Sequence, residues 1–263
     1  MYNTLIIKLP LKFFLLVAIL SIPFWILGAF FDLTKYIPIQ LPISALMFFC
    51  PMLAAIILTN KNGKKGDLKI LLSRIWDFNK IKNKAWLLVT ILLIPVLMYL
   101  TYIGMILLHF NLPKPEIKLS ATIILAFLFF IGSIGEEVGW TGFITDPLQK
   151  PFGALNAALV LGTVWAVWHI IPYIQTHRNA SWILWQCIGT VALRIVMVWL
   201  YNNTNKSLFV VIVFHTTINI SVNLFPKNGS HYNPFYFGII LIVAAIIISF
   251  FGFTKSDPLE IQR

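Results

Sequence analysis

The chain has few charged residues, and acidic ones are especially scarce. Only 11% of its 263 residues are charged, with 20 Lys and Arg against nine Asp and Glu. A soluble domain of this length usually carries about 25% charged residues. The hydrophobic fraction reaches 59% instead, so the composition argues strongly against a soluble fold.

Cysteine is nearly absent as well. Cys50 and Cys187 both lie in apolar runs, so we expect two reduced packing residues and neither a disulfide framework nor a cysteine metal cluster. The first apolar run begins near Lys12 and shows no small-residue cleavage site before Phe30. This pattern predicts a retained helix and not a signal peptide.

Long apolar runs are what the chain has in abundance. Roughly 20 apolar residues cross the hydrocarbon of a bilayer as a helix. The runs predict an all-α fold, a polytopic transmembrane helical bundle of about eight spans, at residues 13–31, 37–59, 85–110, 120–144, 153–173, 180–201, 207–226 and 234–253.

One connection, residues 60–84, is strongly basic. Its apolar residues follow helical spacing, which indicates an amphipathic helix on an anionic membrane face; an ordinary basic loop is the alternative. The partners expected are therefore anionic lipid headgroups, and nucleic acid is not expected. The eight basic residues are Lys61, Lys64, Lys65, Lys69, Arg74, Lys80, Lys82 and Lys84.

The basic residues also predict the orientation of the chain. With the N-terminus inside, 14 of them fall on the cytoplasmic side, namely the eight above with Lys8, Lys12, Lys150, Lys206, Lys255 and Arg263. Five fall outside, namely Lys35, Lys114, Lys118, Arg178 and Lys227. The excess of positive charge inside predicts that both termini are cytoplasmic.

Glu136 and Glu137 are the only carboxylates inside the predicted spans. An ionisable group near the bilayer centre costs about 2.5–3.5 kcal/mol on insertion scales, so such residues usually have a function; snorkelling at the interface is the alternative. Their helix also carries a stripe of small residues that would let another helix approach closely. The stripe consists of Gly132, Gly135, Gly139 and Gly142.

Two further spans carry histidine. His169 follows Trp165 by four residues, and His215 precedes Asn219 by four, so each pair shares one helix face. A lone intramembrane His is often only a hydrogen-bonding residue between helices. Glu-Glu, His and His-x-x-x-Asn on three separate spans together favour a functional site.

These motifs resemble the CPBP family of intramembrane proteases, which includes type II CAAX prenyl endopeptidases and bacterial Abi or bacteriocin-immunity proteins. The matching segments are Glu136-Glu-Val-Gly-Trp-Thr-Gly142, Trp165-Ala-Val-Trp-His169 and His215-Thr-Thr-Ile-Asn219. The resemblance implies a CPBP-like catalytic core at 120–226. Residues 1–119, with three helices and the basic segment, would precede this core, and residues 227–263, with the last helix and a tail, would follow it.

The resemblance implies an intramembrane endopeptidase of the CAAX-protease type that acts on a peptide or membrane-protein substrate. Glu136 would be the general base, His169 would position the water, and His215 and Asn219 would donate to the oxyanion. Glu137 would support His169. Two kinds of water activation stay open: Zn²⁺ or another divalent metal held by Glu136, His169 and His215, or no metal at all.

One position departs from the family pattern. The first motif usually reads Glu-Glu-x-x-x-Arg, but the Arg position here is Thr141. Arg194, the only basic residue deep in a predicted span, could replace that cation by pairing with Glu137; alternatively, it reaches the surface near Tyr201. Thr141 also favours the alternative function, a non-proteolytic immunity or partner-binding protein that retains the polar core. A small transporter is a third reading.

In straight helices, Glu136 would lie near the cytoplasmic side and His169 near the other, so a broken stretch around 147–153 or a deep start to the fifth helix is needed to bring them together. A composition rich in Ile, Lys and Asn favours a multi-pass protein of a bacterial plasma membrane.

Overall fold

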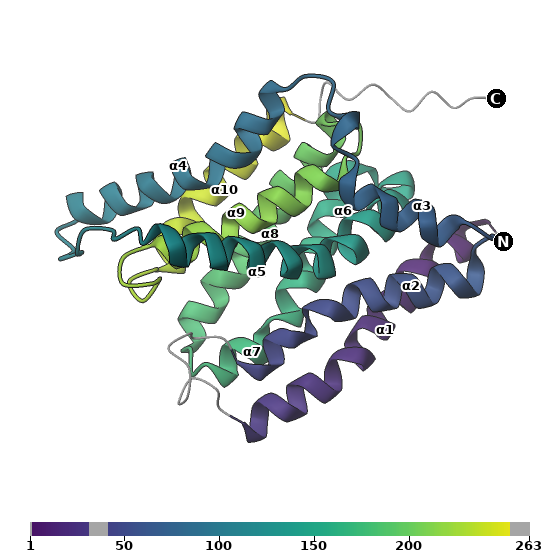
Figure 1. The fold of residues 1–263 in the computed structure, drawn as a ribbon, viewed down its shortest axis with the longest axis horizontal. Coiled ribbons are helices and arrows are strands. Elements are labelled where there is room, and N and C mark those ends of the chain that lie inside the picture. Colours follow the sequence, from purple (N-terminus) through teal and green to yellow (C-terminus); the bar gives the residue numbers. More distant parts are fainter. Residues whose placement is uncertain (1, 32–41, 253–263) are drawn as a thin grey trace.

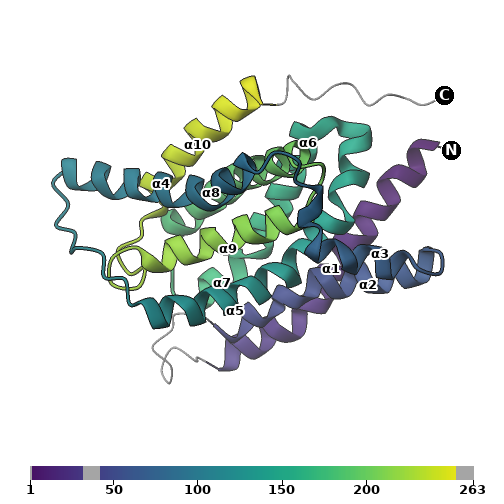
Figure 2. The same ribbon diagram turned by 45° about the horizontal axis from the view of Figure 1, so that its top comes forward.

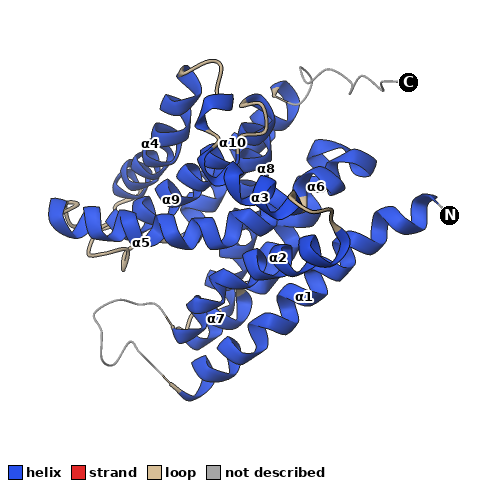
Figure 3. Ribbon diagram, turned by 45° about the vertical axis from the view of Figure 1, so that its right-hand side comes forward, coloured by secondary structure: helices blue, strands red, loops and turns tan. Residues whose placement is uncertain are grey.

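A computed structural model describes residues 2–31 and 42–252, and side chains from residue 8 onward. The described residues form helices joined by loops, with no strand among them (Figure 3). Seven of the helices are long and apolar enough to cross a membrane, and an eighth, α9, is a shorter apolar helix. The all-α, multi-pass bundle is therefore confirmed.

The N-terminal part contains α1 (Tyr2–Phe30), the 3₁₀ segment η2 (Ile43–Phe49) that continues into α2 (Cys50–Asn62), and α4 (Ala85–Leu107). The predicted start of the second span, residues 37–41, lies outside the described residues. Cys50 is buried in α2, and Cys187 is half-buried; both are free, as expected.

The basic segment does not form one amphipathic helix. It folds into a short helix, α3 (Asp67–Ser73), and two 3₁₀ turns, η3 (Arg74–Trp76) and η4 (Phe78–Lys80). Leu71 is 7% exposed, and the apolar side of the segment packs onto the protein. The helical spacing of the apolar residues is therefore confirmed over 67–76, although the helix is short. Periodicity alone does not distinguish a face that lies on lipid from one that lies on the core, and the contact with lipid stays a prediction.

The remaining helices carry the predicted motifs. They are α5 (Leu119–Glu137), the π-helical turn η5 (Val138–Phe143), α6 (Thr145–Trp168), α7 (Ile170–Gln175), α8 (Ala180–Asn203), α9 (Leu208–Leu224) and α10 (Pro234–Phe251). The sequence places Asn179 and Asn233 before α8 and α10, where their side chains accept backbone N–H bonds as helix caps.

The core of the bundle surrounds α9. This helix packs against α4, α5 and α8 (Figures 1 and 2). It has 17 residues and is about 25 Å long, which is short for a span. Most of its apolar residues are nevertheless buried against protein.

The outer helices expose large apolar side chains. Wide exposed apolar surface is a liability in water, but it matches the hydrocarbon of a bilayer. Examples are Leu88 and Ile91 on α4, Ile123 and Phe127 on α5, and Ile246 and Phe250 on α10.

Three segments that the charge count assigns to the cytoplasm meet in the structure. Lys206 pairs with Asp146 at 3.0 Å, and the Asn205 amide donates to the Lys80 carbonyl at 2.8 Å. The basic segment, the start of α6 and the turn after α8 therefore lie on one side, in agreement with the predicted topology.

Candidate active site

Glu136 and Glu137 stand where α5 ends and the π-turn η5 begins. A π-turn holds one extra residue and often marks a functional site; here the Ile144 N–H donates five residues back, to the Gly139 carbonyl, at 3.2 Å. A Cβ atom on Gly139 would collide with the backbone of Pro51 in α2. The glycine therefore lets α2 lie directly against the turn that carries the carboxylates.

The predicted glycine stripe is confirmed in part. Besides Gly139, Gly135 lies against the Phe48 carbonyl, where a Cβ would be only 2.8 Å away. Gly142 lies close to side chains of α3 and α9, whereas Gly132 has open space around it. Three of the four glycines thus serve close packing.

Glu137 lies at the centre of a fully buried ion-pair network. Its carboxylate receives two hydrogen bonds from the Arg194 guanidinium, from Nη1 to Oε2 at 2.8 Å and from Nη2 to Oε1 at 3.1 Å. Thr141 donates its hydroxyl to Oε2 at 2.5 Å. Both side chains of the ion pair are 0% exposed.

The hypothesis that Arg194 supplies the missing cation is confirmed by this geometry. The guanidinium reaches Glu137 from α8, while Thr141, at the position where the resemblance implies Arg, bonds the same carboxylate. The alternative, an Arg194 that extends to the surface near Tyr201, is wrong. The residue bonded to the Tyr201 hydroxyl is Arg74.

Trp165 of α6 connects the remaining side chains of the site. Its indole N–H donates to Glu136 Oε2 at 2.6 Å, and its carbonyl lies 2.9 Å from His169 Nδ1. Its ring has the Arg194 guanidinium 4.2 Å from its centroid and the His215 ring at 5.3 Å. The predicted site residues Glu136, His169 and His215 therefore meet around one indole.

The bonding partners define how the two imidazoles are oriented. His169 Nδ1 faces the Trp165 carbonyl, and His215 Nδ1 faces Glu137 Oε1 at 3.0 Å. Carbonyl and carboxylate oxygens only accept hydrogen bonds, so both Nδ1 atoms carry a proton. In each neutral imidazole the Nε2 atom then keeps its lone pair for a water or a ligand.

One predicted pairing differs in the structure. Glu137 was expected to support His169, but its imidazole partner is His215 of α9. His169, at the turn that ends α6, is instead held by the carbonyl of Trp165, four residues earlier. The helix of Glu137 packs against α9, which brings His215 to its carboxylate.

Asn219 lies one turn beyond His215 on the same helix and is half-buried. Within the described part of the chain, its amide has no hydrogen-bond partner. It is therefore available to donate to a bound molecule.

The apparent depth conflict between Glu136 and His169 is resolved by a bend. Gly153 adopts φ 74° and ψ 166° within α6, a conformation that glycine reaches without a steric penalty. This bend lies in the stretch where a break was expected, and the C-terminal half of α6 brings Trp165 to Glu136.

The donor chemistry suits a divalent ion, but the arrangement does not form a cage. Two imidazoles with Nδ1 on acceptors and one carboxylate are typical of metal-binding side chains. Among the residues that the structure describes, however, no group of three His, Cys, Asp or Glu side chains is arranged to hold an ion. The Zn²⁺ expectation therefore stays a prediction.

Fold and site together define a multi-pass helical membrane protein with a buried Glu, His and Arg centre. Residues 118–221 match the family described as "Type II CAAX prenyl endopeptidase Rce1-like". The chain is also 22% identical over 254 residues to "CAAX prenyl protease 2" of Methanococcus maripaludis. This alignment covers 91% of the present chain and 93% of that protein. These matches confirm the resemblance and support a peptidase of the CAAX type.

Sequence analysis missed the part played by Trp165. The sequence motif placed Trp165 only on the same helix face as His169. The signal was nevertheless present, because indole differs from phenyl by one N–H donor, and a donor in an apolar span predicts a nearby acceptor. That acceptor is Glu136.

Proposed function

We propose that this chain is an intramembrane endopeptidase that hydrolyses a peptide bond with a water activated by Glu136 and His169. The observation that supports it is the convergence of Glu136, His169 and His215 around Trp165. Peptide hydrolysis needs a base, a held water and donors for the oxyanion. Each of these is matched by a named side chain.

In the proposed reaction, the water lies between Glu136 and Nε2 of His169. Glu136 takes one proton as the water oxygen bonds to the scissile carbonyl carbon. The resulting oxyanion accepts hydrogen bonds from the Asn219 amide and from His215 in its protonated form. The C–N bond then breaks, and Glu136 passes its proton to the leaving amine.

Glu137 and Arg194 play a supporting part in this scheme. Glu137 orients His215 through Nδ1, while Arg194 is the counter-charge of Glu137. A divalent ion would be held by Glu136, His169 and His215 and would act as a Lewis acid. No step of the proposed reaction passes through it.

The alternative, a non-proteolytic immunity or partner-binding protein, rested on Thr141. Arg194 now provides the cation that Thr141 lacks, so this departure no longer favours a lost activity. The substrate class we propose is a peptide or membrane protein that is cleaved near the cytoplasmic side, in the plasma membrane of a bacterium.

Cleavage by the purified protein tests the proposal. Wild type and Glu136→Gln would be reconstituted and offered quenched fluorescent peptides, with and without a prenyl group on a C-terminal cysteine. We expect wild type to cleave at least one peptide and Glu136→Gln to cleave none. Equal rates for the two proteins would show that Glu136 is not the base, and the accumulation of both in membranes is the control.

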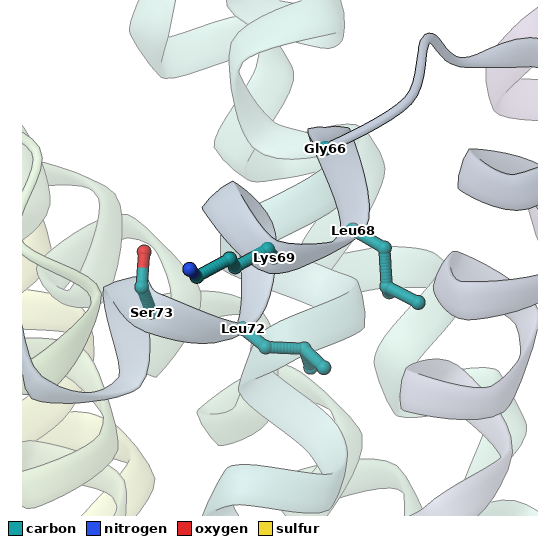
Figure 4. Close-up of a pocket in the computed structure, with 5 residues that line it drawn as sticks. All are labelled: Gly66, Leu68, Lys69, Leu72 and Ser73. Carbon is teal, nitrogen blue, oxygen red and sulfur yellow. The ribbon is translucent and has the colours of Figure 1, made fainter.

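We further propose that residues 60–84 contact anionic phospholipid. All seven lysines of this segment are exposed, and so are Ile70 and Trp76. A shallow, open hollow on the surface at α3 is lined by Leu68, Lys69 and Leu72 together with Gly66 and Ser73 (Figure 4). Lys69 and Ser73 extend to one side of it and the two leucines to the other, which suits a headgroup and an acyl chain.

Retention of lipid tests this contact. Native mass spectrometry of protein taken from mixed phosphatidylglycerol and phosphatidylcholine vesicles should show bound phosphatidylglycerol. The Lys64→Gln, Lys65→Gln, Lys69→Gln variant should retain less of it. Equal retention by variant and wild type would refute the contact.

A further inference from the structure

The inner face of the basic segment is bonded to both helices that carry the carboxylates and His215. Arg74 of η3 donates from Nη1 to the Gly142 carbonyl at 2.7 Å. Gly142 belongs to the π-turn that follows Glu136 and Glu137. A π-turn leaves carbonyls without their usual helical partners, and Arg74 satisfies one of them.

The same guanidinium also reaches α8. Its Nη2 donates to the Tyr201 hydroxyl at 2.6 Å, and that hydroxyl donates to Asp146 Oδ2 at 3.1 Å. Tyr201 is fully buried. Arg74 therefore joins the π-turn, the end of α8 and the start of α6 from one position.

Asp77 binds the start of α9. Its carboxylate accepts hydrogen bonds from the Ser207 hydroxyl at 2.8 Å and from the N–H groups of Leu208 at 3.2 Å and Phe209 at 3.1 Å. These are backbone donors that the first turn of a helix leaves unpaired, and a negative charge there is favoured by the helix dipole. The Asp77 side chain is only 8% exposed.

Trp76 lies between these two residues and contacts the same pair of helices. Its ring centroid is 5.8 Å from that of Phe130 on α5 and 6.4 Å from that of Phe209 on α9. The residues Arg74, Trp76 and Asp77, here named the clasp, thus connect α5–η5 to α9 at one end of the site.

We propose that the clasp fixes the position of His215 relative to Glu136 and Glu137, so that Arg74 and Asp77 are positioning residues for the reaction. The effect on turnover rests on the proposed peptidase function. The coupling of the helix ends is independent of it. His215 lies seven residues, about 10 Å, beyond Leu208 along α9, so a shift of the first turn is carried to the imidazole by a rigid helix.

Two measurements distinguish a local effect of the clasp on the site from a general loss of stability. Hydrogen exchange of the full-length protein in detergent would follow peptides that cover 138–145 and 207–215. We expect Asp77→Ala to speed exchange at the start of α9 about tenfold, the effect of a lost helix cap, and Arg74→Ala to do so at the π-turn. Asn79→Ala, an exposed neighbour, is the matched control and should change neither.

Kinetics give the second readout. Asp77→Ala should lower kcat about 10- to 100-fold, because misplacing a reacting group by about 1 Å has such an effect, with little change in KM. Asp77→Asn and Arg74→Lys keep part of each contact and should give intermediate values, which remain measurable if the alanine variants fail to fold.

The outcomes are distinguishable. Unchanged exchange at α9 in Asp77→Ala and Asp77→Asn would overturn the clasp, whatever the activity. Faster exchange with kcat equal to that of Asn79→Ala would overturn its positioning role. If wild type cleaves no peptide, the peptidase proposal fails, and the exchange data alone decide whether the clasp holds the helix ends together.

Discussion

Removing Arg194 should leave a buried carboxylate without a counter-charge. Arg194 makes two charge-assisted hydrogen bonds to Glu137, a longer bond to the Thr141 hydroxyl at 3.4 Å, and a contact with the Trp165 ring. Neither charged side chain is exposed. Deleting one partner of such a pair costs about 3–5 kcal/mol, mostly through the uncompensated charge.

The loss is large enough to measure in detergent. For a protein of this size, 3–5 kcal/mol corresponds to a fall in the apparent Tm of roughly 6–20 °C. We expect Arg194→Ala to show this fall and Cys187→Ala, on the same helix, to show almost none. Because Glu137→Gln removes the charge, adding it to Arg194→Ala should recover part of the lost stability.

A second rescue tests whether an arginine at position 141 can replace Arg194 as the partner of Glu137. Thr141→Arg restores the family residue and should recover stability or cleavage in the Arg194→Ala background. The reasoning would be refuted by a double-mutant cycle in which the losses of Arg194→Ala and Glu137→Gln simply add, since residues in contact are coupled by 0.5–3 kcal/mol.

Four further results are expected. His215→Ala should abolish cleavage while the protein still accumulates in membranes, because removing one residue of a cooperating catalytic set lowers the rate nearly as much as removing all of them. A loss of cleavage that parallels a loss of protein from the membrane would instead indicate a structural polar core. Gly139→Ala should lower stability by about 1–3 kcal/mol through overpacking against α2, whereas Gly132→Ala, with open space around it, should be tolerated in the same unfolding assay. Reporter fusions at the C-terminus and near Lys227 should read inside and outside, and the same side for both would contradict the eight-helix topology. Chelation tests the Zn²⁺ prediction: if Glu136, His169 and His215 hold an ion, chelation should abolish cleavage and added Zn²⁺ should restore it, whereas cleavage that persists after chelation would contradict the prediction.

The sequence predicted most of what depends on local pattern. Apolar runs located the seven candidate spans and the shorter apolar helix α9 of the described residues, and the three motifs identified side chains that the structure brings together. The pairing of Arg194 with Glu137 could be anticipated because a buried charge without a partner strongly destabilises a fold. A cation and an anion in the same apolar bundle are therefore expected to pair. The absence of Arg at position 141 supplied the clue.

Other features depended on packing that no local pattern records. The choice of His215 over His169 as the partner of Glu137 follows from α9 lying against α5. The basic segment was interpreted through its positive charge and its apolar spacing, whereas Arg74 and Asp77 face inward and bind backbone groups of distant helices. Their partners lie 68 and 132 residues away along the chain, beyond the reach of any periodicity.

The bend at Gly153 also determines how the chain matches the thickness of its bilayer. The apolar stretch Thr145–Gln175 has 31 residues and would be about 46 Å long as one straight helix, against about 30 Å of hydrocarbon. A span that long would have to tilt or thicken the lipid around it. By turning its first eight residues aside, α6 presents a shorter length to the membrane. A substitution of Gly153 that straightened this helix would therefore create a hydrophobic mismatch and would also move Trp165. The match between helix length and bilayer thickness and the geometry of the site thus depend on the same glycine.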